Sequence, residues 1–213
     1  MRLSKPGINR LGLQSSFPLP FPRPEPHCLQ LAYKGISMRR FLIASAAAVL
    51  TASAALADLE AGDAAPDFTV EGFQAGEAQS FTLSEALANG PVVAFFFPAA
   101  FTSGCEAQAA NFAENIEQFE ALGAQVIGLT AGNVDRLSEF STQHCADAFP
   151  VFAVSDEMIG DYDARLRPGG SWTGRITYVI DQDSTIAYHY ADGNPYPHVD
   201  NSLTVLRAMG EAE

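Results

Sequence analysis

The sequence predicts a three-layer α/β domain with a mixed central sheet over residues 58–213. Strand and helix patterns alternate from Asp63 to Met209, as they do in α/β proteins. No repeat or low-complexity linker divides this stretch. The chain has 213 residues, of which 47% are hydrophobic and 17% charged. This length is enough to form one hydrophobic core, because domains usually hold about 100–200 residues.

The first half of the domain begins with two short strands, at 68–73 and 80–83. The segment 84–90 follows as a brief helix that ends at Gly90. The run VVAFFF at 92–97 has the valines and aromatic residues of a fully buried strand. This strand leads directly to a lone cysteine, Cys105.

A long helix is predicted over 103–123, where Ser103 and Glu106 have the spacing of a capping box and Gly123 ends the pattern. Its apolar face comprises Ala109, Phe112, Ala113, Ile116 and Phe119. Cys105 therefore lies in the first turn of this helix.

The remaining elements complete the alternation of strands and helices. A helix over 133–149, with Asn133 as its N-cap, and a closing helix over 200–209 provide the helical segments. The expected strands lie at 124–130, 151–156, 175–181 and 184–190, and the last two form a hairpin.

The front of the chain differs in composition from the domain. Residues 1–37 include PLPFPRPEP and show no periodicity, which predicts a disordered extension. Residues 38–57 carry a basic pair, a short apolar run and an A-L-A site, the features of a signal peptide cleaved after Ala57. Met38 is then a candidate true start, and an anchoring helix is the alternative reading. Cleavage implies a periplasmic or secreted protein, and the alternative is a cytoplasmic one.

Charge narrows the possible partners. Residues 58–213 hold 24 acidic side chains against five arginines and no lysine, a net charge near −19. A surface of this sign repels phosphate backbones and anionic lipids, so nucleic-acid and membrane-surface roles are excluded. Without residues 1–57, the chain keeps two of its cysteines, Cys105 and Cys145. These could form a structural disulfide, a redox pair or neither.

The position of Cys105 favours reactivity, because a thiolate attacks electrophiles whereas a thiol does not. Unpaired N–H groups and the positive end of a helix dipole would face its sulfur. Thr102 adds a hydroxyl three residues earlier, and Pro98 lacks a competing N–H. The alternative is that Cys105 is a buried small hydrophobic residue.

Pro98, Thr102 and Cys105 form the pattern P-x-x-x-T-x-x-C after an apolar strand. With FPVFAVSDE at 149–157 and RITYVID at 175–181, this pattern resembles the peroxiredoxins, within the alkyl hydroperoxide reductase and thiol-specific antioxidant superfamily. The resemblance runs from GDAAPDF at 62–68 to LTVLRAM at 203–209 and is greatest to the bacterioferritin comigratory protein group. It implies a thioredoxin-like form of the three-layer α/β fold.

The resemblance also implies a function: an antioxidant thiol peroxidase that reduces hydrogen peroxide and small organic hydroperoxides. Cys105 would be the nucleophile, while Arg175 favours its thiolate and stabilises the developing negative charge. The Thr102 hydroxyl and the Cys105 N–H would orient the peroxide, Pro98 would shield the site and Gln108 would support it. No metal, haem or flavin is implied, and a thioredoxin-like protein or a small thiol would be the reductant.

The sulfenic acid formed at Cys105 must then be resolved. Many relatives place a resolving cysteine five residues later, where this chain has Ala110. Cys145 is the tentative resolver, which requires movement around both cysteines, and a one-cysteine cycle with an external thiol is the alternative. The oligomeric state stays open between monomer and homodimer. Two rival functions are a thiol–disulfide oxidoreductase, against which the missing C-x-x-C counts, and a redox-inactive binding domain.

Overall fold

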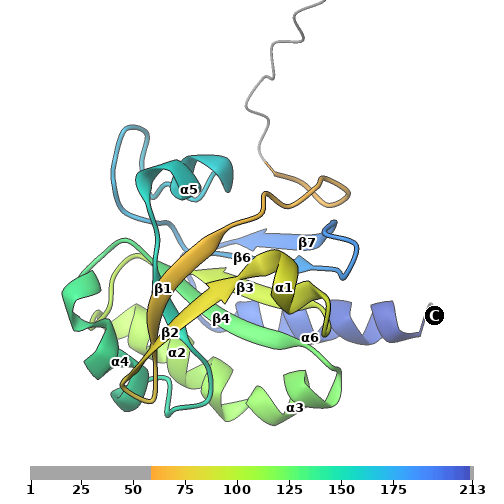
Figure 1. Ribbon diagram of the computed structural model, residues 1–213, viewed down its shortest axis with the longest axis horizontal. Helices are drawn as coiled ribbons and strands as arrows, with labels where there is room; N and C mark the ends of the chain where they lie inside the picture. Colours follow the sequence, from red (N-terminus) through yellow and green to blue (C-terminus); the bar gives the residue numbers. More distant parts are fainter. Residues whose placement is uncertain (1–58, 212–213) are drawn as a thin grey trace, which may run out of the picture. The chain divides into compact units, whose positions relative to one another are not determined.

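A mixed seven-stranded sheet organises residues 59–211, the part of the chain that the computed structural model describes (Figure 1). The strands are β1 (Thr69–Gln74), β2 (Glu77–Thr82), β3 (Val92–Phe96), β4 (Gln125–Thr130), β5 (Val151–Ala153), β6 (Ile176–Ile180) and β7 (Ile186–Ala191). Their order is β2-β1-β5-β4-β3-β6-β7. Strands β3, β4 and β5 are parallel, and the outer strands pair antiparallel. All seven expected strands are present, including the β6–β7 hairpin. The extension, the signal peptide and its cleavage site lie outside the described residues.

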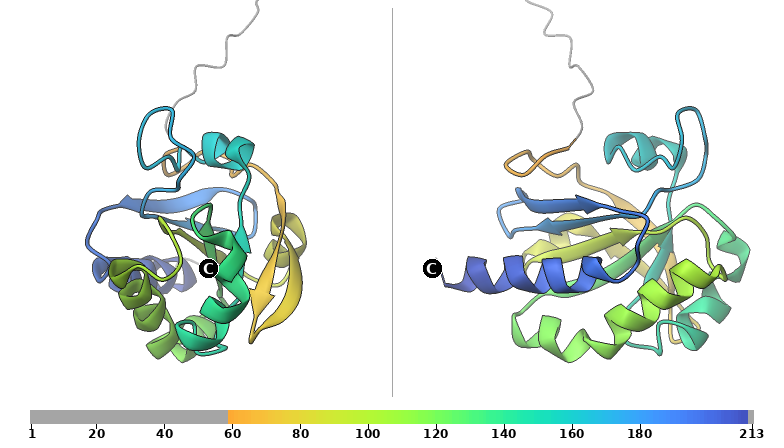
Figure 2. Two further views of the ribbon diagram at one scale, coloured as in Figure 1. Left: turned by 90° about the vertical axis from the view of Figure 1, so that its left-hand side faces the viewer. Right: turned by 180° about the vertical axis from the view of Figure 1, so that it is seen from behind.

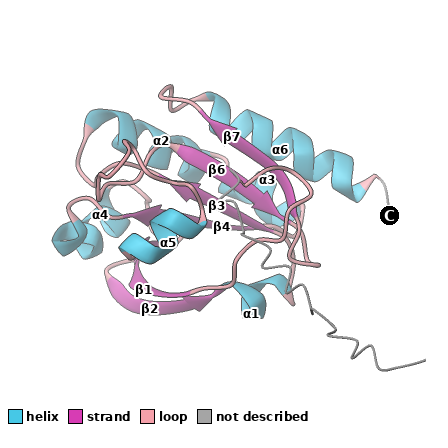
Figure 3. Cartoon of the chain, turned by 90° about the horizontal axis from the view of Figure 1, so that it is seen from above, coloured by secondary structure: helices cyan, strands magenta, loops and turns pink. Residues whose placement is uncertain are grey.

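Helices cover both faces of the sheet (Figure 3). They are α1 (Leu83–Leu87), α2 (Ser103–Glu114), α3 (Ile116–Ala121), α4 (Leu137–Gln143), α5 (Asp156–Asp161) and α6 (Pro197–Gly210). Alternate residues of β3 point to opposite faces, so Val93 and Phe95 pack with α2, α3, α4 and α6, whereas Ala94 and Phe96 pack with α1 and α5. Figure 2 shows α6 beside α2. The result is the expected three-layer arrangement, with the nucleophile candidate on the α2–α6 side.

The single helix predicted over 103–123 is wrong, because the chain breaks it at Asn115 into α2 and α3. The Asn115 side chain donates to the Asn111 carbonyl at 2.8 Å and accepts from Gln118 Nε2 at 2.7 Å. Asparagine side chains that bond locally compete with the helical backbone, which explains the interruption.

The helix predicted over 133–149 is also shorter than expected. Asn133 adopts a left-handed conformation with φ 55° and makes no capping bond, a 3₁₀ turn follows at Val134–Arg136, and α4 ends at Gln143. The chain then turns through Ala146 and Asp147, which have φ values of 48° and 62°. Non-glycine residues rarely adopt this region, so helical periodicity alone did not reveal the turn.

Helix α5 was not predicted, although its start carries a recognisable signal. The Ser155 side chain accepts a hydrogen bond from the Met158 N–H at 3.2 Å, and Asp156 and Glu157 occupy the first turn. A serine cap followed by two acids is a typical helix start. The strand predicted over 151–156 is too long, because β5 ends at Ala153.

Candidate functional site

The loop between β3 and α2 is held in place by hydrogen bonds to its carbonyl groups. Thr173 Oγ1 donates to the Phe97 carbonyl at 2.6 Å, and Thr130 Oγ1 donates to the Pro98 carbonyl at 3.3 Å. Asn133 Nδ2 donates to the Ala100 carbonyl at 2.7 Å. The loop therefore presents Pro98 and the start of α2 in a fixed geometry.

Gly132 allows the loop after β4 to approach the Pro98 loop closely. A Cβ atom at this position would lie 2.2 Å from the Pro98 carbonyl oxygen, a distance that no side chain can adopt. The Gly132 carbonyl in turn accepts from the Ala100 N–H at 3.1 Å. Sequence reasoning missed Gly132, Thr130 and Thr173, because each acts on a loop remote in sequence.

The start of α2 differs in detail from the predicted capping box. Thr102, not Ser103, is the N-cap, and no side-chain capping bond forms there. With Ser103 as the cap, Cys105 would be the second residue of the helix. With Thr102 as the cap it is the third, and it remains in the first turn. The Glu106 side chain does not return to the cap, because its Oε1 points toward His144 and lies 3.5 Å from that residue's Nε2. The N–H groups of Cys105 and Glu106 both donate to the Thr102 carbonyl at 2.9 Å.

Two of the groups expected to contact peroxide already have partners. The Thr102 hydroxyl donates to the Ala99 carbonyl at 3.1 Å, so its hydrogen is engaged while its lone pairs can still accept. The Cys105 N–H donates to the Thr102 carbonyl, so it can orient peroxide only through a three-centre hydrogen bond.

Arg175 directly precedes β6, and its guanidinium has three partners. Two of them lie on α2, and the third is a backbone carbonyl after β7. Its Nη2 lies 3.7 Å from Cys105 Sγ, its Nη1 donates to Gln108 Oε1, and its Nε donates to the Gly193 carbonyl at 3.1 Å. A guanidinium only donates, so the Gln108 amide must turn its oxygen toward Arg175. Gln108 Nε2 is then a buried donor for which the described residues provide no partner.

Gly104 leaves room for this guanidinium. A Cβ atom at position 104 would lie 3.0 Å from Arg175 Nη2, tighter than an ordinary contact. Cys105 itself is 1% exposed, and a charge acts more strongly in such surroundings than in water. The guanidinium of Arg175 and the N-terminus of α2 are the two positive groups beside the sulfur.

Pro98 and Arg175 line the same surface groove of about 440 Å³, together with Arg165 and Leu166. The structure therefore brings together four of the predicted residues: Cys105, Arg175 and Gln108 through direct contacts, and Pro98 along the groove beside Arg175. Thr102 caps the helix that carries Cys105. The buried residue His198, in the first turn of α6, is considered below.

Cys145 follows α4 and belongs to the same hydrophobic cluster as Cys105. Both thiols are free, and no disulfide joins them. Burial, with a smaller contribution from the charge of Asp147, raises the pKa of the Cys145 thiol far above its ordinary value. Cys145 is therefore protonated and enclosed in this state, and its resolving role stays a prediction.

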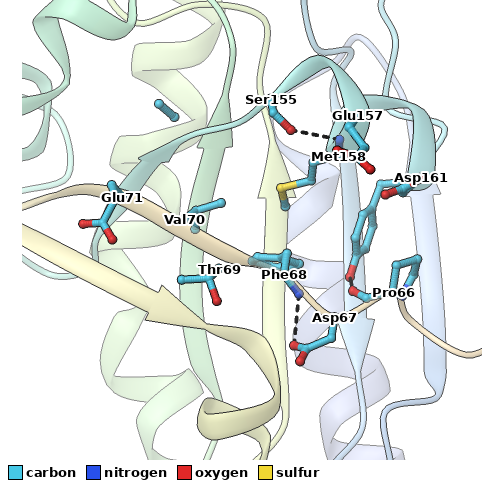
Figure 4. A pocket seen from close by; sticks show the side chains of 12 residues that line it. Pro66, Asp67, Phe68, Thr69, Val70, Glu71, Ser155, Glu157, Met158 and Asp161 are labelled. Carbon is cyan, nitrogen blue, oxygen red and sulfur yellow. Dashed lines mark hydrogen bonds between the residues drawn. The ribbon is translucent and has the colours of Figure 1, made fainter.

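A separate hollow lies between β1 and α5, on the opposite face of the sheet (Figure 4). Asp67, Glu157 and Asp161 border it, and it holds no cysteine. Within residues 59–211 no three histidine, cysteine or acidic side chains gather as metal ligands. No helix in this range is both long and apolar enough to cross a membrane. The Cys105 region is thus the candidate nucleophile site.

Comparison with known proteins identifies the family of the chain. The profile of the AhpC/TSA family matches residues 61–189. The chain is 32% identical over 152 residues to peroxiredoxin Q, chloroplastic, of Oryza sativa subsp. japonica, covering 70% of this chain and 67% of the relative. It is 28% identical over 155 residues to peroxiredoxin Bcp of Escherichia coli, covering 70% of this chain and 96% of that protein.

Among solved structures, the peroxidoxin BcpB of Mycobacterium tuberculosis superposes with a TM-score of 0.63 at 26% identity, covering 70% of this chain and 97% of that one. AhpC of Mycobacterium bovis, at 23% identity and a TM-score of 0.62, covers 73% of this chain and 94% of that one. These superpositions confirm the expected thioredoxin-like fold. The rival functions, a disulfide oxidoreductase and an inactive binding domain, are not favoured.

Proposed function

Because the chain belongs to the AhpC/TSA family, the peroxiredoxins, we propose that its thiol peroxidase chemistry proceeds through Cys105. The observation that carries this proposal is the 3.7 Å contact between Arg175 Nη2 and Cys105 Sγ at the N-terminus of α2. For Cys145, the other cysteine among the described residues, burial and the charge of Asp147 raise the pKa of the thiol and keep it protonated.

The reaction is a displacement at oxygen. The Cys105 thiolate attacks one oxygen of a hydroperoxide and forms an S–O bond, while the O–O bond breaks and the other oxygen leaves with both bonding electrons. Proton uptake converts the leaving group to water or an alcohol, and Cys105 becomes a sulfenic acid. The sulfur is oxidised by two electrons and the peroxide is reduced by two.

The roles of the neighbouring side chains follow from their hydrogen bonds. Arg175 stabilises the thiolate and the negative charge that develops on the leaving oxygen. Thr102, whose hydrogen is held by the Ala99 carbonyl, accepts the hydrogen of the peroxide O–H and orients it. Gln108 positions Arg175 and offers its unpartnered Nε2 to an oxygen in the site. Pro98 shields the approach.

Peroxiredoxins use no prosthetic cofactor, and a thiol returns the electrons. We propose hydrogen peroxide and small organic hydroperoxides as substrates and a thioredoxin-like protein or a small thiol as reductant. Cys145 is the proposed resolver, which must leave its buried position to reach the sulfenic acid. We expect a monomer or a homodimer.

Location is a separate proposal. The signal-like segment 38–57 predicts export with cleavage after Ala57, to the periplasm or outside the cell. The peroxiredoxin Q relatives are chloroplastic. N-terminal sequencing of the protein isolated from its native cells tests the cleavage, because cleavage after Ala57 leaves Asp58 as the first residue and a retained N-terminal segment contradicts it.

The chemistry is tested by intact mass and peptide mapping of the reduced protein after one equivalent of hydrogen peroxide, with and without a sulfenic-acid trap. We expect either a trapped oxygen on Cys105 or, without the trap, a loss of two hydrogens mapped to Cys105 and Cys145. The first result alone, with Cys145 still free, establishes a one-cysteine cycle. An unmodified Cys105 contradicts the proposal. Peptide mapping also separates both cysteines from Cys28.

A further inference from the structure

His198 lies in the first turn of α6 and is completely buried. Its two ring nitrogens have different partners: Nδ1 lies 2.9 Å from Thr177 Oγ1, and Nε2 lies 3.1 Å from the Asp192 carbonyl oxygen. Thr177 is also completely buried, and the Tyr190 ring packs edge-on against the imidazole at 4.9 Å. A buried imidazole with both nitrogens engaged has one orientation.

The partners also fix its protonation pattern. A carbonyl oxygen can only accept, so Nε2 must carry a hydrogen. Burial, together with the nearby positive charge of Arg175, lowers the pKa of His198, so the ring is neutral and Nδ1 is an acceptor. The Thr177 hydroxyl therefore donates to Nδ1, and the hydrogen bonds run in one direction from β6 through the ring to Asp192.

Both ends of this chain of hydrogen bonds adjoin Arg175. Thr177 is two residues after Arg175, so the two side chains leave the strand toward the same face of the sheet. Asp192 precedes Gly193, whose carbonyl accepts from Arg175 Nε at 3.1 Å. His198 thus ties the segment that carries the guanidinium to the loop that holds it.

We infer that His198 is a positioning residue: by bridging Thr177 and the Asp192 carbonyl, it fixes the Gly193 carbonyl that holds the Arg175 guanidinium against Cys105. This inference rests on the proposed role of Cys105. His198 contacts neither the sulfur nor a substrate, and it acts through the position of the cation. Without the bridge, the 192–194 loop relaxes, Arg175 samples other rotamers, and the thiolate loses a stabilising charge.

The test compares His198→Leu with His198→Gln in the full chain. The glutamine amide carries an NH2 donor group and a carbonyl acceptor, so it can donate to one partner and accept from the other as the neutral ring does, whereas leucine fills space without hydrogen bonding. Two readouts are measured: the rate of Cys105 oxidation by hydrogen peroxide and the pH profile of Cys105 alkylation, which reports the thiolate fraction.

For His198→Leu we expect oxidation to slow by about tenfold and the alkylation profile to move to higher pH, because one ion-pair contact is weakened. His198→Gln should stay within roughly threefold of the wild type on both readouts, since the amide retains the bridge. Tyr178→Phe is the control: it removes a buried hydrogen bond to the Tyr162 carbonyl from the other hydrophobic cluster and should not move the profile.

The outcomes separate the inference from the proposed function. A wild-type Cys105 that peroxide does not oxidise overturns the proposed function. A reactive wild type with an unchanged profile in His198→Leu overturns the role of His198. If His198→Leu does not fold, Thr177→Val replaces it, because valine keeps the shape and removes the donor to Nδ1. An unmoved profile in Thr177→Val then overturns the inference.

Discussion

Cys105 and Cys145 are buried to the same degree, 1% and 0% exposed, in one hydrophobic cluster, but their polar surroundings are opposite. Cys105 begins a helix and lies beside Arg175. Cys145 follows a helix, and burial together with the negative charge of Asp147 raises the pKa of its thiol. The neighbouring arginine and the helix start, and not the degree of burial, therefore distinguish the proposed nucleophile from Cys145.

The backbone differs between the two regions as well. The Cys105 loop is held by Thr130, Asn133 and Thr173, which fix a geometry before any substrate arrives. Left-handed residues occur in both regions, because Phe101 precedes Cys105 with φ 60° while Ala146 and Asp147 follow Cys145. The anchoring hydrogen bonds, and not backbone strain, therefore distinguish the two regions, and a fixed loop suits the proposed attacking thiol.

The largest expected effect separates the two cysteines directly. Cys105→Ser should reduce the second-order rate with hydrogen peroxide by at least about 1,000-fold, because a hydroxyl is a far weaker nucleophile than a thiolate. Cys145→Ser, the matched control, should retain the rate of the first oxidation. Stopped-flow measurement with equal peroxide gives both values. A wild-type rate in Cys105→Ser would show that Cys105 is not the attacking thiol.

Replacing the cation should have the next largest effect. Arg175→Met keeps a long side chain without charge, and we expect a 100- to 1,000-fold slower oxidation of Cys105, in the range of roughly 10²–10³ found when one charge-stabilising donor is removed. Arg175→Lys restores the charge but not the fork that contacts the sulfur, Gln108 and Gly193 together, so it should recover only part of the rate. Equal rates in Arg175→Met and the wild type would mean that the helix N-terminus activates Cys105 unaided.

Local pattern predicted much of the molecule, and tertiary contact supplied the rest. The alternation in β3 and the motif around Cys105 are local, so the sheet, its two faces and the family were predictable, whereas the role of Cys105 stays a prediction. Asn133 was read as a helix cap, but it bonds the Ala100 carbonyl across the fold. His198 had no metal-like spacing, and its neighbours, Thr177 and Asp192, meet it only after folding. Periodicity contains no information on such pairs.

A smaller effect is expected at Gly104. Gly104→Ala places a methyl group 3.0 Å from Arg175 Nη2, so the guanidinium must shift by a few tenths of an ångström. We expect a threefold to tenfold slower oxidation of Cys105, while stability rises by up to about 1 kcal/mol because alanine favours the helix. Gly210→Ala, where the added Cβ meets nothing within 4 Å, controls for helix propensity. A stabilised variant with an unchanged rate would show that the guanidinium position is not critical.

The smallest effect concerns Cys145 and appears in stability at alkaline pH. Burial raises the pKa of its thiol in the folded state, so above pH ~8.5 the unfolded chain releases a proton that the native state retains. The stabilisation is complete below that pH and is lost as pH rises, by at most about 1.4 kcal/mol per pH unit. Reduced wild type and Cys145→Ala, unfolded in urea between pH 8.5 and 10, should therefore differ in slope, with the alanine variant flatter. Cys105 and Cys28 are common to both proteins, so their contributions cancel. Parallel slopes would mean that Cys145 ionises as freely in the native state as in the unfolded one, which would contradict the raised pKa of the buried thiol.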